Sequence, residues 1–260
     1  MNKKLVVLDI ECYPNYFLIA LKGLESSKLI TFECYGEHSA LTKDERKRLR
    51  NVMNAYTTFG FNSNNYDMPV LVYALSGATC SELHTLTNSI IQDRLPYWMA
   101  YRNLGLDQPT FDHFDIAEPS PAVMISLKNY GTRVGSKKLW DLPFDPHVPV
   151  TRDEADILKD YCENDLDVTI DLYEAIADRI DLRISMGEQY GLDLRSKSDA
   201  QIAEAVISSE LQKVGVIAKK PELPSTYKAL YTAPGFIHFE TEQLSALVAQ
   251  VETIPFHLQA

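Results

Sequence analysis

The sequence predicts an α/β protein in which a mixed β-sheet is flanked by helices. Three β-like segments come first, at residues 4–10, 15–22 and 28–34, and they are rich in aliphatic and aromatic side chains. A further β-like segment follows the first helical segment, and most of the later chain has helical character. Strands in series, a later strand after a helix and a helix-rich remainder are typical of this fold class.

The elements after the third strand alternate between helices and strands. In chain order they are expected as a helix at 43–54, a strand at 57–61, a helix at 67–76, helical segments within 81–104, a strand at 110–116, and helices at 126–134 and 152–180. The charged run Lys43–Arg50 is interpreted as a solvated helix face. The last of these helices is expected to break near Asn164.

The C-terminal part differs in character from the rest. A helix is expected over 198–213, followed by a proline-containing stretch and a β-like run over 235–239. We therefore expect a main domain over residues 1–187 and a small α+β appendage, or the start of another domain, over 188–260.

Composition excludes several classes of protein. The 260 residues contain 45% hydrophobic residues, without the long apolar run that a membrane span needs. The N-terminus does not have the pattern of a signal peptide, and the four scattered cysteines predict neither a disulfide framework nor a zinc site. A formal charge of −11 argues against binding nucleic acid by bulk electrostatics. We expect a reducing, cytoplasmic setting and no membrane partner.

Two acids interrupt the first β-like segment. Because side chains alternate along a strand, Asp9 and Glu11 point to the same face. Two like charges on one face of a buried strand are unfavourable unless a metal ion or basic groups neutralise them.

Two later segments supply further acids. Asp67 follows an Asn-rich turn at the start of an expected helix, where an acid taken alone is more often a helix cap than a ligand. Tyr161 and Asp165 are four residues apart on an expected helix and share a face. Tyr161 alone would most often be a packed aromatic residue. The neighbouring Glu163 and Asp167 are interpreted as solvated surface acids, with Asp167 an alternative to Asp165.

Taken together, the three segments resemble the DEDD (DnaQ-like) 3′→5′ exonucleases of the subtype with tyrosine in the third motif. Asp-x-Glu, the Asn-x-x-x-Tyr-Asp of residues 62–67 and the Tyr-x-x-x-Asp of residues 161–165 occur in the family's order. The second motif is most similar to the proofreading domain of family B DNA polymerases, phage enzymes included. The resemblance covers roughly residues 4–180 and implies a ribonuclease-H-like sheet with the acids at one end.

The resemblance also implies a catalytic site. Transferred residue by residue, Asp9, Glu11, Asp67 and Asp165 would hold two divalent cations, Mg²⁺ or Mn²⁺, about 3.5–4 Å apart. Tyr161 would orient the attacking water, because a phenol with a pKa of about 10 is a poor base at neutral pH.

The substrate-binding residues follow from the same resemblance. Asn62 would contact the 3′-terminal nucleotide, and Phe61 and Tyr66 would stack on bases or pack in the core. Cys12 replaces a substrate-touching threonine of many relatives, so its backbone amide is the expected contact. Asp115 lies on an expected strand whose end could point toward the site, where it would at most support the residues that act. The basic residues are interpreted as surface residues, with a phosphate-facing patch as the alternative: Lys128, Arg133, Lys137 and Lys138.

The expected activity is metal-dependent 3′→5′ exonucleolytic hydrolysis of single-stranded or frayed DNA ends, as the proofreading part of a phage-type DNA polymerase. A polymerase module in cis or in trans is the expected partner, in the host cytoplasm if the protein is viral. One alternative is an RNA 3′-trimming exonuclease of the same fold. Another is a non-catalytic nucleic-acid-binding or scaffold module, against which the retention of all four acids counts.

Overall fold

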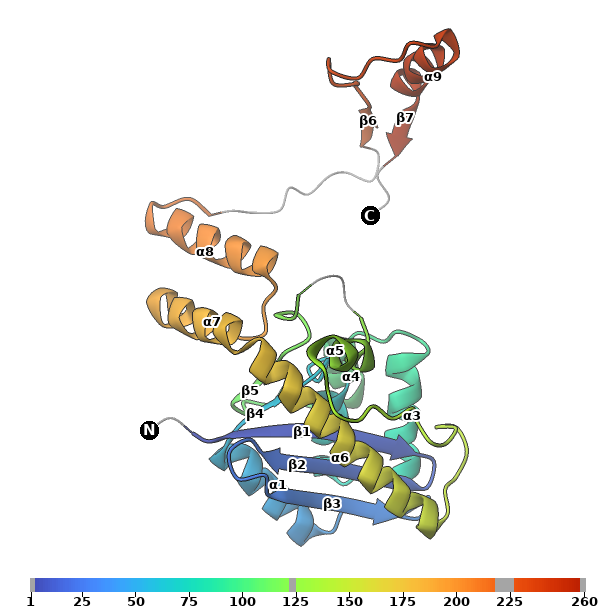
Figure 1. The fold of residues 1–260 in the computed structure, drawn as a ribbon, viewed down its shortest axis with the longest axis vertical. Helices are drawn as coiled ribbons and strands as arrows, with labels where there is room; N and C mark the ends of the chain where they lie inside the picture. The colour runs from blue at the N-terminus through green and yellow to red at the C-terminus, as the bar shows by residue number, and fades with distance from the viewer. Residues whose placement is uncertain (1–2, 122–124, 218–226, 258–260) are drawn as a thin grey trace. The chain divides into compact units, whose positions relative to one another are not determined.

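A five-stranded mixed sheet lies at the centre of the N-terminal part of the chain (Figure 1). The computed structural model describes residues 3–121, 125–217 and 227–257, and the chain divides into two units, residues 1–207 and 208–260. The strands of the sheet are β1 (Leu5–Tyr13), β2 (Tyr16–Gly23), β3 (Leu29–Tyr35), β4 (Thr57–Gly60) and β5 (His113–Asp115). They are ordered β3-β2-β1-β4-β5, in which β1, β2 and β3 pair antiparallel and β4 pairs parallel with both β1 and β5. The predicted α/β class with a mixed, helix-flanked sheet is confirmed.

Helices flank this sheet on both faces. The flanking helices are α1 (Lys43–Ala55), α2 (Asp67–Ser76), α3 (Cys80–Ile91), α4 (Tyr97–Leu104), α5 (Leu127–Val134) and α6 (Arg152–Ala175). They are followed along the chain by α7 (Ala177–Tyr190) and α8 (Asp199–Lys213). Three of them, α1, α3 and α6, begin with a Thr-x-x-Glu capping box in which the threonine and the glutamate satisfy each other's backbone N–H groups. Among the described residues, no helix is both long and apolar enough to cross a membrane.

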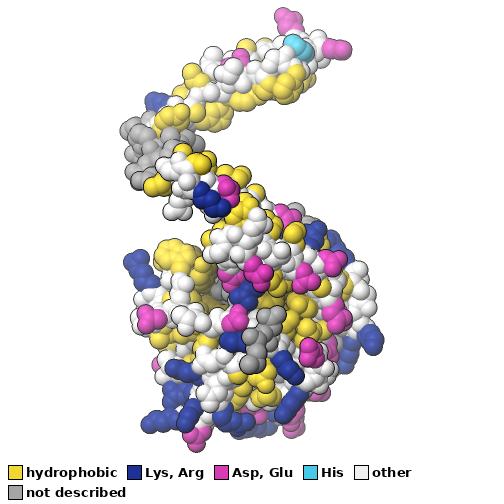
Figure 2. Space-filling view, turned by 90° about the vertical axis from the view of Figure 1, so that its left-hand side faces the viewer, with side chains coloured by type: hydrophobic (Ala, Val, Ile, Leu, Met, Phe, Trp, Pro, Cys, Tyr) yellow, Lys and Arg dark blue, Asp and Glu magenta, His cyan; other side chains and the backbone are white. Residues whose placement is uncertain are grey.

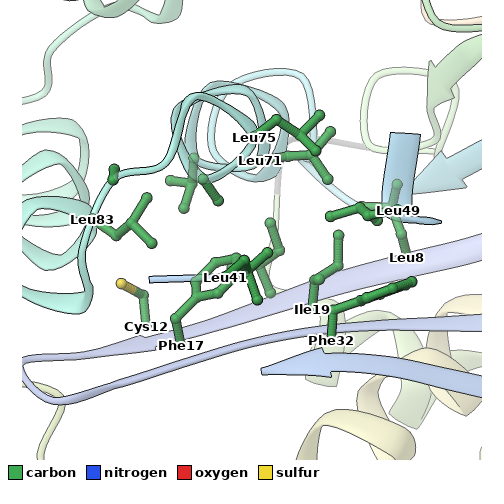
Figure 3. Packing of buried hydrophobic residues seen from close by; sticks show 14 of the residues in the cluster. Leu8, Cys12, Phe17, Ile19, Phe32, Leu41, Leu49, Leu71, Leu75 and Leu83 are labelled. Atoms are coloured by element: carbon green, nitrogen blue, oxygen red, sulfur yellow. The ribbon is translucent and has the colours of Figure 1, made fainter. Parts of the chain in front are cut away.

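Alternation along β1 separates two hydrophobic clusters. Val6, Leu8, Ile10 and Cys12 pack in the cluster that includes α1 to α4, as Figure 3 shows for Leu8 and Cys12. Val7 and Tyr13 pack in the cluster on the other face, which includes α5 and α6. Figure 1 shows α6 crossing that face over β1 and β2. Asp9 and Glu11 have the same parity as Val7 and Tyr13, so they face α6.

Two expectations about the elements are wrong. The helix that begins at Arg152 runs without interruption past Asn164 and breaks instead at Ile176, which separates α6 from α7. The β-like run over 235–239 is not a strand. The strands of that region are β6 (Lys228–Leu230) and β7 (Pro255–His257), which pair antiparallel with each other.

Segment 193–199 holds the end of α7 and the start of α8 to the first unit. Ser196 Oγ accepts the backbone N–H of Asp115 at 2.9 Å. The side chain of Arg183 is only 2% exposed, and it donates to Lys197 O at 2.9 Å and to Asp199 Oδ1 at 2.6 Å. The division between the units therefore falls within α8, whereas the boundary expected after residue 187 lies within α7.

The second unit is small and exposes most of its apolar side chains. Besides β6 and β7 it contains α9 (Glu242–Thr253), whose described side chains include none that is buried. Phe236 is 83% exposed, and the hydrophobic side chains on the visible face of this unit stand out at the top of Figure 2. Pro221 and Pro224 of the expected proline-containing stretch lie outside the described residues.

Replacing Arg183 with alanine should lower the free energy of unfolding of the first unit by about 2–3 kcal/mol, because the charged donor satisfies carbonyl groups that would lose their partners. Chemical denaturation of the full chain would measure this change. Arg179→Ala is the matched control, since Arg179 is half-exposed and lies 3.7 Å from Asp199 Oδ2. Its expected change is under about 1 kcal/mol. Equal losses in both variants would contradict the role assigned to Arg183 in holding residues 197 and 199.

Candidate active site

The centre of the candidate site is the pair of acids on β1. One carboxylate oxygen of Asp9, one of Glu11 and the Sγ atom of Cys162 lie within 4.8 Å of one another. The thiol of Cys162 donates to Asp9 Oδ2 at 3.5 Å. The structure therefore brings α6 against the acids of β1 at the position of Cys162.

Helix α6 also contributes Tyr161 and Asp165. The phenol of Tyr161 interacts with the carboxylate of Asp165, four residues further along the helix. Tyr161 is largely buried, whereas Asp165 is half-buried. Asp165 interacts electrostatically with both Asp9 and Glu11, although its oxygens do not belong to the 4.8 Å group.

Asp67 enters the site from the turn between β4 and α2. It is the first residue of α2, and the N-cap residue Tyr66 makes no side-chain capping bond. The Asp67 side chain is 3% exposed and interacts electrostatically with Asp9 and Glu11. Within the described part of the chain, its Oδ1 atom has no hydrogen-bond partner. A buried carboxylate oxygen without a partner is unfavourable unless a cation or water satisfies it.

The turn that carries Asp67 is organised by Asp115 at the end of β5. Asp115 accepts the backbone N–H groups of Asn62 at 2.8 Å, Asn64 at 2.9 Å and Ala117 at 2.9 Å. Asn62 adopts a left-handed conformation with φ 56°, which asparagine tolerates better than most residues. Asp115 thus positions the turn that carries Asp67, and its backbone contacts give a specific form to the supporting place expected from the sequence.

Burial raises the pKa of all four acids, and repulsion by neighbouring acids adds to this rise at Asp9, Glu11 and Asp67. Desolvation and the charge of Asp165 raise the pKa of Asp9 to about 7. Desolvation is also the largest cause for Glu11 and Asp67, whose pKa values lie well above the ordinary range, and for Asp165, whose pKa is raised less strongly. Without a cation, the cluster favours bound protons over full ionisation.

This donor set fits divalent cations. The four side chains offer oxygen ligands, which hard cations such as Mg²⁺ and Mn²⁺ prefer. Positive charge at the cluster would relieve the repulsion that raises the pKa values, and it would satisfy the partnerless oxygen of Asp67. The residues present are therefore suited to such ions.

Two lysines near α6 interact with different sets of acids. Lys22 on β2 donates to Glu163 Oε1 at 3.0 Å and to Asp167 Oδ1 at 2.6 Å, so these two acids are paired away from the cluster. The Lys128 ammonium lies 5.7 Å from the centre of the Tyr161 ring. Its positive charge offsets part of the rise in the pKa of Glu11 and of Asp165. Exposed Asp141 holds the Lys128 ammonium at 3.1 Å.

Two of the expected substrate-binding residues lie at the turn before α2. The side chain of Asn62 is half-buried, and its Oδ1 accepts a hydrogen bond from Asn65 Nδ2 at 2.8 Å. Phe61 packs edge-on against Tyr130 of α5 with 5.7 Å between ring centres. Both side chains retain some exposure.

The other two belong to the core on the far side of β1. Tyr66 packs against the cluster of α1 to α4, and its hydroxyl lies 3.4 Å from Thr87 Oγ1. Cys12 is 4% exposed, and burial raises the pKa of its thiol to about 12. Figure 3 shows its side chain in that core near Leu83, so only the backbone of Cys12 is left for a substrate contact.

No family model, curated protein or solved structure matches this chain.

The raised pKa of Asp9 makes stability depend on pH in a defined direction. A pKa of about 7 in the folded protein exceeds the value of about 3.9 in unfolded chains, so the stability contribution of Asp9 is complete below about pH 4. That contribution is lost as the pH rises through 7. Without divalent cations, wild type should therefore lose melting temperature relative to Asp9→Asn between pH 4 and 7.

Thermal unfolding followed by circular dichroism would measure this difference. Asp107→Asn, which alters an exposed acid in a loop, is the control and should parallel wild type. Parallel curves for wild type and Asp9→Asn would contradict the assigned environment of Asp9.

Proposed function

We propose that the protein is a metal-dependent 3′→5′ exonuclease that removes nucleotides from single-stranded or frayed DNA ends. The observation that supports this most directly is the convergence of Asp9, Glu11, Asp67 and Asp165, from three separate elements, on one largely buried cluster. A cluster of four carboxylates with raised pKa values is more typical of a functional site than of a structural core.

The fold is compatible with this proposal. Three antiparallel strands and two strands that pair parallel with β1 and with each other, with α6 packed over β1, are compatible with the ribonuclease-H-like sheet proposed for residues 1–187. The proposed partners are a single-stranded DNA 3′ end and a polymerase module in cis or in trans, in the host cytoplasm if the protein is viral. The RNA-trimming alternative uses the same site.

The acids would hold two divalent cations, Mg²⁺ or Mn²⁺. When bound, such ions supply a hydroxide nucleophile near neutral pH and stabilise the departing 3′ oxygen. Asp9 and Glu11 approach from the rigid β1 strand, which fixes their separation. Asp67 and Asp165 approach from helix positions that Asp115 and Tyr161 support, so the ligand geometry is set before substrate arrives.

Tyr161 is suited to orienting a water molecule. Burial and the neighbouring Asp165 and Glu11 raise the pKa of its phenol above the ordinary value of about 10, so the hydroxyl stays protonated at neutral pH. A protonated phenol cannot accept the proton as a general base. It can donate one hydrogen bond and accept another, which fixes the position of a water beside Asp165.

Lys128 is suited to contacting a phosphate of the substrate. Its ammonium group lies over the Tyr161 ring and acts on the acids, and its present partner, Asp141, is fully exposed. An exposed ion pair of this kind contributes little to stability, so replacing Asp141 by a phosphate as the partner of Lys128 costs little free energy.

The central test is a matched pair of substitutions on α6. Asp165→Asn should reduce nucleotide release in Mn²⁺ by at least about a hundredfold, because it removes a ligand charge from the cluster. Asp167→Asn removes the same charge two residues away, where the acid pairs with Lys22, and should retain most of the activity.

Release would be followed on matched DNA and RNA oligonucleotides labelled at the 5′ end. Faster release from DNA supports the proposal, whereas faster release from RNA favours the trimming alternative. Inactive wild type, or equal loss in both variants, would contradict the assigned site.

Lys128→Ala should weaken binding of single-stranded DNA with little effect on melting temperature. Loss of one phosphate contact should lower the slope of log affinity against log salt by about 0.7. Fluorescence anisotropy at several salt concentrations, with catalysis blocked by Asp165→Asn, would measure this slope. Lys159→Ala is the control, because Lys159 lies on α6 but pairs with Glu33. An unchanged slope in Lys128→Ala would rule out a phosphate contact.

A further inference from the structure

We propose that Cys162 forms, with Asp9 and Glu11, a second mode of metal binding that takes a thiophilic divalent cation such as Zn²⁺ or Cd²⁺. This cation would occupy the carboxylates that the proposed function assigns to Mg²⁺ or Mn²⁺, and it would therefore inhibit the exonuclease. The inhibition rests on the proposed function, whereas the binding site rests on the geometry alone.

The three donor atoms are close enough to share one ion. In a tetrahedral zinc site with bonds of about 2.0–2.3 Å, any two donor atoms lie about 3.3–3.8 Å apart. The donor atoms of Asp9, Glu11 and Cys162 already lie within 4.8 Å of one another, so small side-chain rotations would bring them to a common centre.

The sulfur atom already points into the carboxylate pair. Cys162 is fully buried, and its thiol donates to Asp9 Oδ2 at 3.5 Å. On binding of the cation, the S–H bond breaks, the proton leaves to solvent, and the sulfur lone pair forms the S–metal bond. The step involves no change of oxidation state.

A separate observation indicates Asp67 as a fourth donor, which lies outside the 4.8 Å group and would need a side-chain rotation to reach the ion. The Oδ1 atom of Asp67 is buried and has no hydrogen-bond partner within the described residues, and Asp67 interacts electrostatically with Asp9. A set of one sulfur and three oxygens is suited to a four-coordinate ion. Thiolate ligands favour Zn²⁺ and related soft cations, while Mg²⁺ prefers oxygen alone, so Cys162 would separate the two classes of cation.

The test measures cadmium binding to the full 260-residue chain. Titration with Cd²⁺ in the absence of other divalent ions should produce an ultraviolet thiolate-to-cadmium charge-transfer band. Cys162→Ser should abolish the part of the band due to this site and weaken Cd²⁺ binding by at least about tenfold. Cys12→Ser is the matched control, because Cys12 is buried on the opposite face of β1 and should leave this part of the band unchanged.

Subtraction of the variant spectra handles the remaining thiols. Cys34 and Cys80 lie with their sulfur atoms 3.4 Å apart and can bind Cd²⁺ on their own, so only the difference between wild type and Cys162→Ser is assigned to this site. Identical bands and affinities in the two proteins would overturn the proposal.

A second variant keeps the proposal testable if Cys162→Ser fails to fold. Glu11→Gln retains the thiol but removes a carboxylate ligand, and it should also weaken Cd²⁺ binding by at least about tenfold. Unchanged affinity in Glu11→Gln would overturn the proposal as well.

Failure of the two proposals can be distinguished. A chain that is active in Mn²⁺ but lacks the Cys162-dependent band retains the proposed function and loses this inference. A chain that shows the band but releases no nucleotide in Mn²⁺ retains the metal site and loses the proposed function.

Discussion

The packing of α6 against the acid-bearing face of β1 is the constraint on which the rest of the site depends. It encloses carboxylates that repel one another, and the surrounding contacts limit how they can be arranged. Cys162 fixes one oxygen of Asp9, and Tyr161 fixes Asp165. Glu163 and Asp167 of the same helix pair with Lys22, so their negative charges are neutralised outside the cluster.

Much of this fold follows from sequence pattern, because most elements are defined by local alternation and capping. The exceptions have physical reasons. No glycine or proline marks the break at Ile176, so the apolar periodicity of α6 continues into α7 without a signal. The run 235–239 has strand-like composition, but it pairs with no strand among the described residues. By contrast, β6 and β7 are three residues each and pair from the two ends of the described segment 227–257.

Some features of the candidate site likewise follow from sequence pattern, and others do not. The positions of Asp9, Glu11, Tyr161 and Asp165 on their faces follow from the periods of strand and helix. The roles of Cys162 and Asp115 do not, because their contacts join residues 153 and about 50 positions apart. A thiol next to an acid motif and an acid at the end of a short strand carry no pattern of their own.

The support of Asp115 by Ser196 has a consequence for how the protein can be shortened or synthesised. Every residue of the acid cluster has left the ribosome once position 165 has emerged, but Ser196 and Asp199 follow only later. A fragment that ends at residue 187 would contain all four acids of the cluster and lack the segment that anchors β5 and α7. The support of the cluster therefore includes residues that follow its last acid, and the shortest fragment that keeps this arrangement is set by anchoring rather than by motif content.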